Sequence, residues 1–182
     1  IQLGGNTNAG VPGYVSQSGK QDENYFSAAT LVAYNVTSST FDGNITYVNG
    51  IPVSGSDVQL FAPGMRNAYD IVLHSNGFLY GTDNGANNDY GNSLVNCTDS
   101  GVNPDSDDRL LLIQKDSYYG HPNKMRALNG DSRQCSYDWY NVENYVAPLE
   151  RAVTGITEFH GDHFAGQLRG HLILGRYQGA LY

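Results

Sequence analysis

Apolar residues along this chain occur in short runs, separated by glycine, asparagine, aspartate and serine. They seldom recur at the three-and-four spacing of an amphipathic helix, whereas several runs have the length and residue types of strands. The pattern therefore predicts an all-β protein. The expected strands are residues 29–35, 45–48, 58–62, 69–73, 78–82, 109–114, 155–159 and 171–177.

The clearest hairpin signal is the pair Asn76-Gly77, which lies between the expected strands 69–73 and 78–82. An Asn-Gly pair supplies the positive φ angles that a tight turn between two right-twisted strands requires. We therefore expect these two strands to pair antiparallel.

Two long polar stretches, residues 83–108 and 123–144, interrupt the strand pattern. Loops of this length in a compact domain usually carry function, glycans or assembly contacts. No linker divides the sequence and no exact repeat is visible, so we expect one domain over residues 1–182. Short strands joined by such loops fit a β-sandwich, or a β-propeller whose blades have diverged.

Charge excludes several classes of partner. Only 15% of the residues are charged, and the formal net charge of -8 repels phosphate backbones and anionic lipid headgroups. No apolar run approaches the roughly 20 residues of a membrane-spanning helix. We expect neither a nucleic-acid partner nor insertion into a membrane.

Three N-glycosylation sequons begin at Asn35, Asn44 and Asn96, in a chain that has two cysteines, Cys97 and Cys135. Sequons together with a cysteine pair favour secretion through an oxidising, glycosylating compartment. We expect N-linked glycans at the three asparagines and a Cys97–Cys135 disulfide, which would close a loop of about 39 residues and contribute roughly 4 kcal/mol. The alternative is two free, buried thiols.

An acidic loop brings together Asp105, Asp107 and Asp108, with Asp99 and Asn103 shortly before them. Carboxylate and amide oxygens are the ligands that Ca²⁺ prefers, although the loop lacks the glycine and terminal glutamate of an EF-hand. It is either a solvated acidic loop or a weak extracellular calcium site.

Histidines offer less chemistry. His160 and His163 flank Asp162 on an expected loop, and surface or hydrogen-bonded histidines are a simpler interpretation than a transition-metal site. For the turn around His121, a structural role is favoured over a catalytic one.

Several motifs follow one another in the order and spacing of a known family. They are GGNTNAG (4–10), APGMRNAYD (62–70), LYGTDNGAN (79–87), DDRLLLIQK (107–115), YYGHPN (118–123) and the stretch 155–174. Together these motifs resemble the glucose/sorbosone dehydrogenases, six-bladed β-propellers whose best-known members use pyrroloquinoline quinone and calcium. The resemblance covers most of the chain and corresponds to the family's middle portion.

The resemblance implies that Arg66 and Asn67 contact the quinone, and that the carbonyls of Gly85 and Ala86 hold its calcium. A blade takes roughly 40 to 50 residues, so 182 residues amount to about four blades, a partial or incomplete β-propeller. The family's general base lies upstream of the first motif, and later quinone-binding arginines lie downstream of the last residue. We therefore expect no tightly bound quinone in this chain alone.

Two functions follow from these observations. The first is a secreted, glycosylated structural or binding protein that associates with copies of itself through open sheet edges, with a filament as one form of the assembly. Carbohydrate is a further candidate ligand. The alternative is a fragment of a quinone- and calcium-dependent sugar dehydrogenase.

Overall fold

A computed structural model describes residues 1–12, 22–53 and 56–177. Within them the chain is built almost wholly of β-strands. The strands are β1 (Gln2–Leu3), β2 (Ala29–Ala33), β3 (Tyr47–Val48), β4 (Ile51–Pro52), β5 (Val58–Pro63), β6 (Ala68–Leu73), β7 (Leu79–Asp83), β8 (Asp108–Ile113), β9 (Tyr145–Leu149), β10 (Val153–Glu158) and β11 (Leu172–Arg176). The helical turns are α1 (Lys124–Leu128), η1 (Ser132–Cys135) and η2 (Phe164–Gly166).

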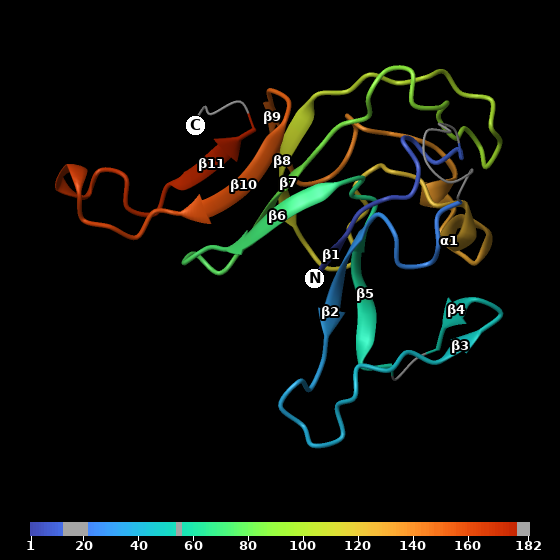
Figure 1. Ribbon diagram of the computed structural model, residues 1–182, viewed down its shortest axis with the longest axis horizontal. Helices are drawn as coiled ribbons and strands as arrows, with labels where there is room; N and C mark the ends of the chain where they lie inside the picture. The colour runs from blue at the N-terminus through green and yellow to red at the C-terminus, as the bar shows by residue number, and fades with distance from the viewer. Residues whose placement is uncertain (13–21, 54–55, 178–182) are drawn as a thin grey trace.

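All strand pairs are antiparallel, and they form three successive sheets and one small hairpin. The sheets are β1-β2-β5, β6-β7-β8-β9 and β10-β11, and β3-β4 is the hairpin. Figure 1 shows the sheets spread like a fan, with the four-stranded sheet between the other two. Over the described residues the sheets do not close into a barrel or a ring, so the fold is a partial all-β one.

Each strand expected from the sequence overlaps an observed strand, and the hairpin at Asn76-Gly77 is confirmed. Gly77 has a φ of 86°, and its N–H donates to the carbonyl of His74. In the described residues, the long segments between β7 and β8 and between β8 and β9 contain no strand of a named sheet, and the second of them contains α1 and η1. The number of about four blades stays a prediction.

Two apolar layers separate the three sheets. Leu111 and Ile113 face the first layer, where they pack with Met65 and Tyr119 against the first sheet. Leu110 faces the second layer, with Val153, Ile156 and Leu174 of the third sheet among its neighbours. Because successive side chains of a strand point to opposite faces, β8 is buried on both faces. This explains its continuous apolar sequence.

The sequence did not reveal β9 or α1. Strand β9 contains Pro148 and lies at the edge of its sheet, where the missing N–H of proline is tolerated. Helix α1 has only five residues and is capped at its N-terminus by Asn123, whose side chain accepts a hydrogen bond from the N–H of Arg126. Such a short helix has too few residues to show a helical period.

Candidate functional site

Most of the residues that the sequence assigned to cofactor or metal binding converge on one pocket. The pocket has a volume of about 260 Å³ and lies where the loop after β5, the end of β7 and the start of β8 meet. Its lining residues are Arg66, Asn67, Asn84, Gly85, Asn87, Asp108, Arg151 and Ala152. The pocket therefore unites Arg66 and Asn67 with Gly85 and Asp108.

The buried carboxylate of Asp83, the last residue of β7, holds the Arg66-Asn67 backbone in place. It accepts hydrogen bonds from the N–H groups of Arg66 at 3.3 Å and Asn67 at 2.8 Å. It also pairs with the buried guanidinium of Arg109 at 2.8 Å, and that guanidinium stacks on the ring of Trp139 at 3.4 Å. This ion pair fixes one wall of the pocket.

The carboxylate of Asp108 joins three segments around the pocket. It accepts hydrogen bonds from the N–H of Gly85 at 2.9 Å, the side-chain amide of Asn84 at 2.7 Å and the N–H of Val153 at 2.9 Å. A side chain at position 85 has no room, since a Cβ there would lie 2.0 Å from the carbonyl oxygen of Ser106. Asp108 and Gly85 therefore connect the second sheet to β10.

The guanidinium of Arg66 is engaged by protein groups. It donates to the backbone and side-chain oxygens of Asn8 at 3.0 and 2.9 Å, and to the carbonyl of Asn84 at 3.3 Å. Burial lowers the pKa of Arg66, and the nearby charge of Asp83 opposes this effect. Arg66 thus ties the N-terminal GGNTNAG motif to the pocket, a contact that the sequence did not predict.

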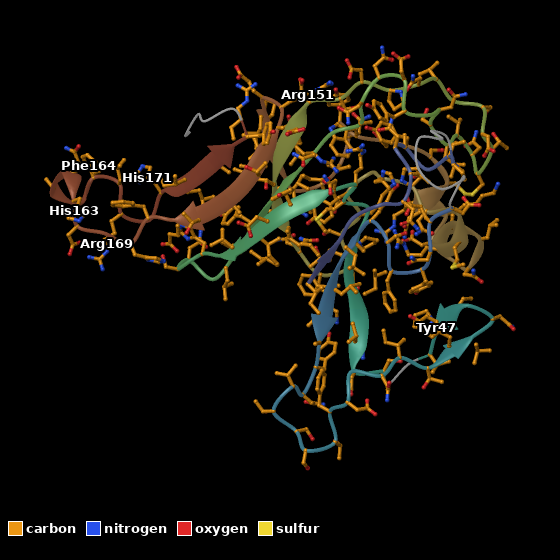
Figure 2. All side chains as sticks on the ribbon, in the orientation of Figure 1. Tyr47, Arg151, His163, Phe164, Arg169 and His171 are labelled. Carbon is orange, nitrogen blue, oxygen red and sulfur yellow. A yellow bond between two sulfur atoms is a disulfide. The ribbon has the colours of Figure 1, made fainter. Side chains whose placement is uncertain are left out.

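A second arginine, Arg151, lines the pocket and was missed in the sequence. It donates to the carboxylate of Asp105 at 2.5 Å and to the carbonyl of Ser106 at 3.1 Å. Figure 2 labels it above the β8 and β9 region. No local motif marks Arg151, because its partners are some 45 positions away in the chain.

The aspartates of the acidic loop have separate surroundings. Asp105 pairs with Arg151, Asp107 is exposed, and Asp108 accepts three hydrogen bonds from protein groups. The carbonyl of Ala86 accepts the N–H of Ser106 at 2.9 Å. In the described part of the chain, no group of three or more His, Cys, Asp or Glu residues is placed to hold a metal ion. His160 and His163 therefore do not belong to such a group. The calcium site stays a prediction.

The pocket does not fit a pyrroloquinoline quinone well. Its volume is below the roughly 300 to 1,000 Å³ of typical ligand pockets. Its two guanidinium groups are also already engaged, Arg66 by Asn8 and Asn84, and Arg151 by Asp105. We derive no chemistry through this cofactor.

The disulfide expected between Cys97 and Cys135 is confirmed, and the alternative of two free thiols is wrong. The two Cα atoms are 4.3 Å apart, and the N–H of Cys97 donates to the carbonyl of Cys135 at 2.7 Å. The bond joins the long segment before β8 to the long segment after it. It therefore constrains the two parts of the chain that have the fewest strands.

The three sequon asparagines, Asn35, Asn44 and Asn96, are all exposed. The side-chain amide of Asn44 donates to Asp42 at 2.6 Å, and hydrogen bonds from Asn44 lower the pKa of Asp42. Exposure is what an acceptor asparagine requires, because the glycan must project into solvent. Glycosylation at these positions stays a prediction.

A buried polar cluster around Glu23 was not foreseen in the sequence. The Glu23 carboxylate accepts hydrogen bonds from the N–H groups of Asn6 and Thr7, from the hydroxyls of Thr7 and Ser27, and from the His121 ring at 2.9 Å. His121 is fully buried, so its contacts support the favoured structural role of this turn. The cluster holds the N-terminal motif against the loop after β8.

Burial alone would raise the pKa of Glu23. The hydrogen bond and charge of His121, with the hydroxyls of Ser27 and Thr7, outweigh burial and lower the pKa from 4.5 to about 2. Glu23 is therefore ionised at neutral pH, and its charge is compensated within the cluster.

Comparison with protein-family models, with curated proteins and with solved structures gives no match for this chain. The resemblance to glucose/sorbosone dehydrogenases therefore stays a prediction from the sequence. Among the described residues no helix is long and apolar enough to cross a membrane.

Proposed function

We propose that this chain is an extracellular, N-glycosylated structural or binding protein that associates end to end with copies of itself. The disulfide supports an oxidising compartment. The exposure of all three sequon asparagines supports glycosylation. The contacts between copies would lie at the two ends of the fan of sheets, which are formed by the first and third sheets.

The observation that carries the proposal is the edge of the two-stranded third sheet in the described residues. This sheet has two strands, β10 and β11, whereas the neighbouring sheet has four. The edge of β10 that does not pair with β11 is covered by β6, where the carboxylate of Asp70 accepts a hydrogen bond from the N–H of Ile156 at 3.1 Å. Strand β11 is an edge strand in the described part of the chain. An edge strand offers backbone donors and acceptors to a further strand.

The sequence of β11 offers little protection against such pairing. Natural edge strands are often shielded by lysines or prolines. Strand β11 reads Leu-Ile-Leu-Gly-Arg, with one charge at its last position. Contact between the unlike ends of identical chains is heterologous, and it grows into a filament unless its rotation closes a ring. Glycans at the exposed asparagines would limit lateral clumping.

Sedimentation velocity of the glycosylated chain over a range of concentrations tests the proposal. We expect species larger than the 19.8 kDa polypeptide, with the average mass rising with concentration. A single monomeric species at every concentration would contradict self-association. Intact mass before and after N-glycosidase treatment tests glycosylation separately, and an unchanged mass would contradict it.

A second candidate function rests on the resemblance, which assigns Arg66, Asn67 and Gly85 of this pocket to the quinone and calcium site of a sugar dehydrogenase. The chain would be a fragment of such an enzyme. We expect the isolated chain to show no dye-linked sugar oxidation after addition of pyrroloquinoline quinone and Ca²⁺. Measurable oxidation would favour the enzyme over the structural protein.

A further inference from the structure

The third sequon, Asn96-Cys97-Thr98, is folded into a tight turn. Two backbone hydrogen bonds between Val95 and Thr98, each 2.9 Å long, close the turn. Its central residues have positive φ angles, 49° at Asn96 and 60° at Cys97. Positive φ angles at both central positions are those of a type I′ turn. In the folded chain this sequon is therefore compact rather than extended.

The hydroxyl of Thr98, the third residue of the sequon, bonds to groups of its own segment. It donates to the carbonyl of Val95 at 2.6 Å and lies 2.7 Å from the hydroxyl of Ser100. The N-x-S/T pattern of acceptor sites means that the glycan transferase requires this hydroxyl together with the asparagine side chain. The turn engages the hydroxyl with the backbone, so the transferase must open the turn before it can use Asn96.

The disulfide opposes this opening, because Cys97 is the middle residue of the sequon. Its partner Cys135 is the last residue of η1, 38 positions further along the chain. The N–H of Cys97 also donates to the carbonyl of Cys135 at 2.7 Å, and the N–H of Asn96 donates to the hydroxyl of Ser136 at 2.9 Å. Local opening breaks hydrogen bonds but not a disulfide, so the oxidised sequon stays tied to η1.

The other two sequons have no such cross-link. They are residues 35–37 and 44–46, in the segment between β2 and β3, which contains no cysteine. Their asparagines and threonines are exposed, and residues 44–46 belong to no helix, strand or turn. Both sequons pass through the same compartment as Asn96, so they serve as internal controls for its modification.

We propose that disulfide formation and glycosylation compete at this sequon: Asn96 is an acceptor before Cys97 bonds to Cys135 and ceases to be one afterwards. This inference rests on the proposed glycosylation and names how one of its sites is regulated. Disulfides form within seconds to hours, so the outcome depends on which step reaches the segment first.

The two competing steps alter adjacent side chains. In glycan transfer, the amide nitrogen of Asn96 bonds to the anomeric carbon of a lipid-diphosphate-linked oligosaccharide. The nitrogen loses a proton, and the lipid diphosphate leaves with the electron pair of the broken carbon–oxygen bond. In oxidation, the thiols of Cys97 and Cys135 lose two protons and two electrons. The disulfide of a thiol oxidoreductase accepts them and becomes two thiols.

Cys135→Ser tests the competition, because it removes the disulfide and keeps the sequon unchanged, which Cys97→Ser would not do. Mass spectrometry of glycopeptides gives the fraction of chains with a glycan at each asparagine. We expect Asn96 to be modified in only part of the wild-type chains, and in a fraction at least about twofold higher in Cys135→Ser. The fractions at Asn35 and Asn44 should be the same in both proteins.

Arg109→Met is the matched control, because it weakens the fold at a buried ion pair and keeps both cysteines. It should leave the modified fraction at Asn96 as in the wild type. An equal rise in Arg109→Met and Cys135→Ser would contradict the inference, because slower folding would then explain the rise. Cell extracts are measured as well as secreted protein, so that a variant retained in the cell still gives a result.

The remaining outcomes separate this inference from the proposed glycosylation. If Asn96 is modified to the same extent in the wild type and in Cys135→Ser, whether fully or not at all, the disulfide does not regulate this site. Glycans at Asn35 and Asn44 would then leave the proposed glycosylation standing. Chains without a glycan at any of the three asparagines would contradict both.

Discussion

The buried cluster around Glu23 makes the stability of this protein depend on acid pH in a defined window. The pKa of Glu23 is about 2 in the folded chain, whereas a glutamate in an unfolded chain has a pKa near 4.5. Each pKa unit corresponds to about 1.4 kcal/mol, so the ionised carboxylate contributes on the order of 3 kcal/mol at neutral pH. Because the folded pKa is the lower one, this contribution is fully present above pH 4.5 and is lost as the pH falls to about 2.

Glu23→Gln tests this reasoning, because the amide keeps the size of the side chain but removes its charge. One amide oxygen cannot replace a carboxylate that accepts five hydrogen bonds, so we expect the free energy of unfolding at pH 7 to fall by about 2–4 kcal/mol. Urea unfolding at pH 7, 4.5, 3 and 2 should show the difference between wild type and variant shrinking below pH 4.5.

The matched control is Glu143→Gln, at an exposed glutamate, which should change the free energy of unfolding by less than about 0.5 kcal/mol at every pH. If the difference between wild type and Glu23→Gln stays constant from pH 7 to pH 2, the charge of Glu23 is not what stabilises the cluster.

Three further predictions concern the disulfide, the buried ion pair of Arg109 and the close packing at Gly85. Replacing Cys97 and Cys135 by serine should lower the free energy of unfolding by about 2–5 kcal/mol, and a reducing agent should then have no further effect on the variant. Arg109→Met should cost about 3–5 kcal/mol in chemical unfolding, since it leaves the buried carboxylate of Asp83 without its cation. Gly85→Ala should cost about 1–3 kcal/mol, whereas Gly175→Ala, where a Cβ meets nothing within 4 Å, should change stability by less than about 0.5 kcal/mol.

The strands were predictable because their signals are local. The run Leu110 to Ile113 is continuously apolar, which is typical of a strand buried on both faces, and that is where β8 lies. Strand β9 was not predictable, because Pro148 and polar neighbours hide an edge strand whose pairing partner, β8, is distant in the sequence.

The residues of the candidate site were predictable by type, but their contacts were not. The resemblance singled out Arg66 and Asn67, and the pocket contains both. The carboxylate of Asp108, one of the candidate calcium ligands, accepts three hydrogen bonds from other segments, and no pattern along the chain indicates them. The cluster of Glu23 and His121 joins residues 98 positions apart, and no pattern along the chain indicates such a contact.

Electron microscopy of the native, glycosylated protein is the most direct test of the central claim, that identical chains associate end to end. We expect filaments or closed rings with a repeat of one fan-shaped unit. Dispersed single particles with about 20 kDa of protein mass, and no larger assembly as the concentration rises, would contradict the claim.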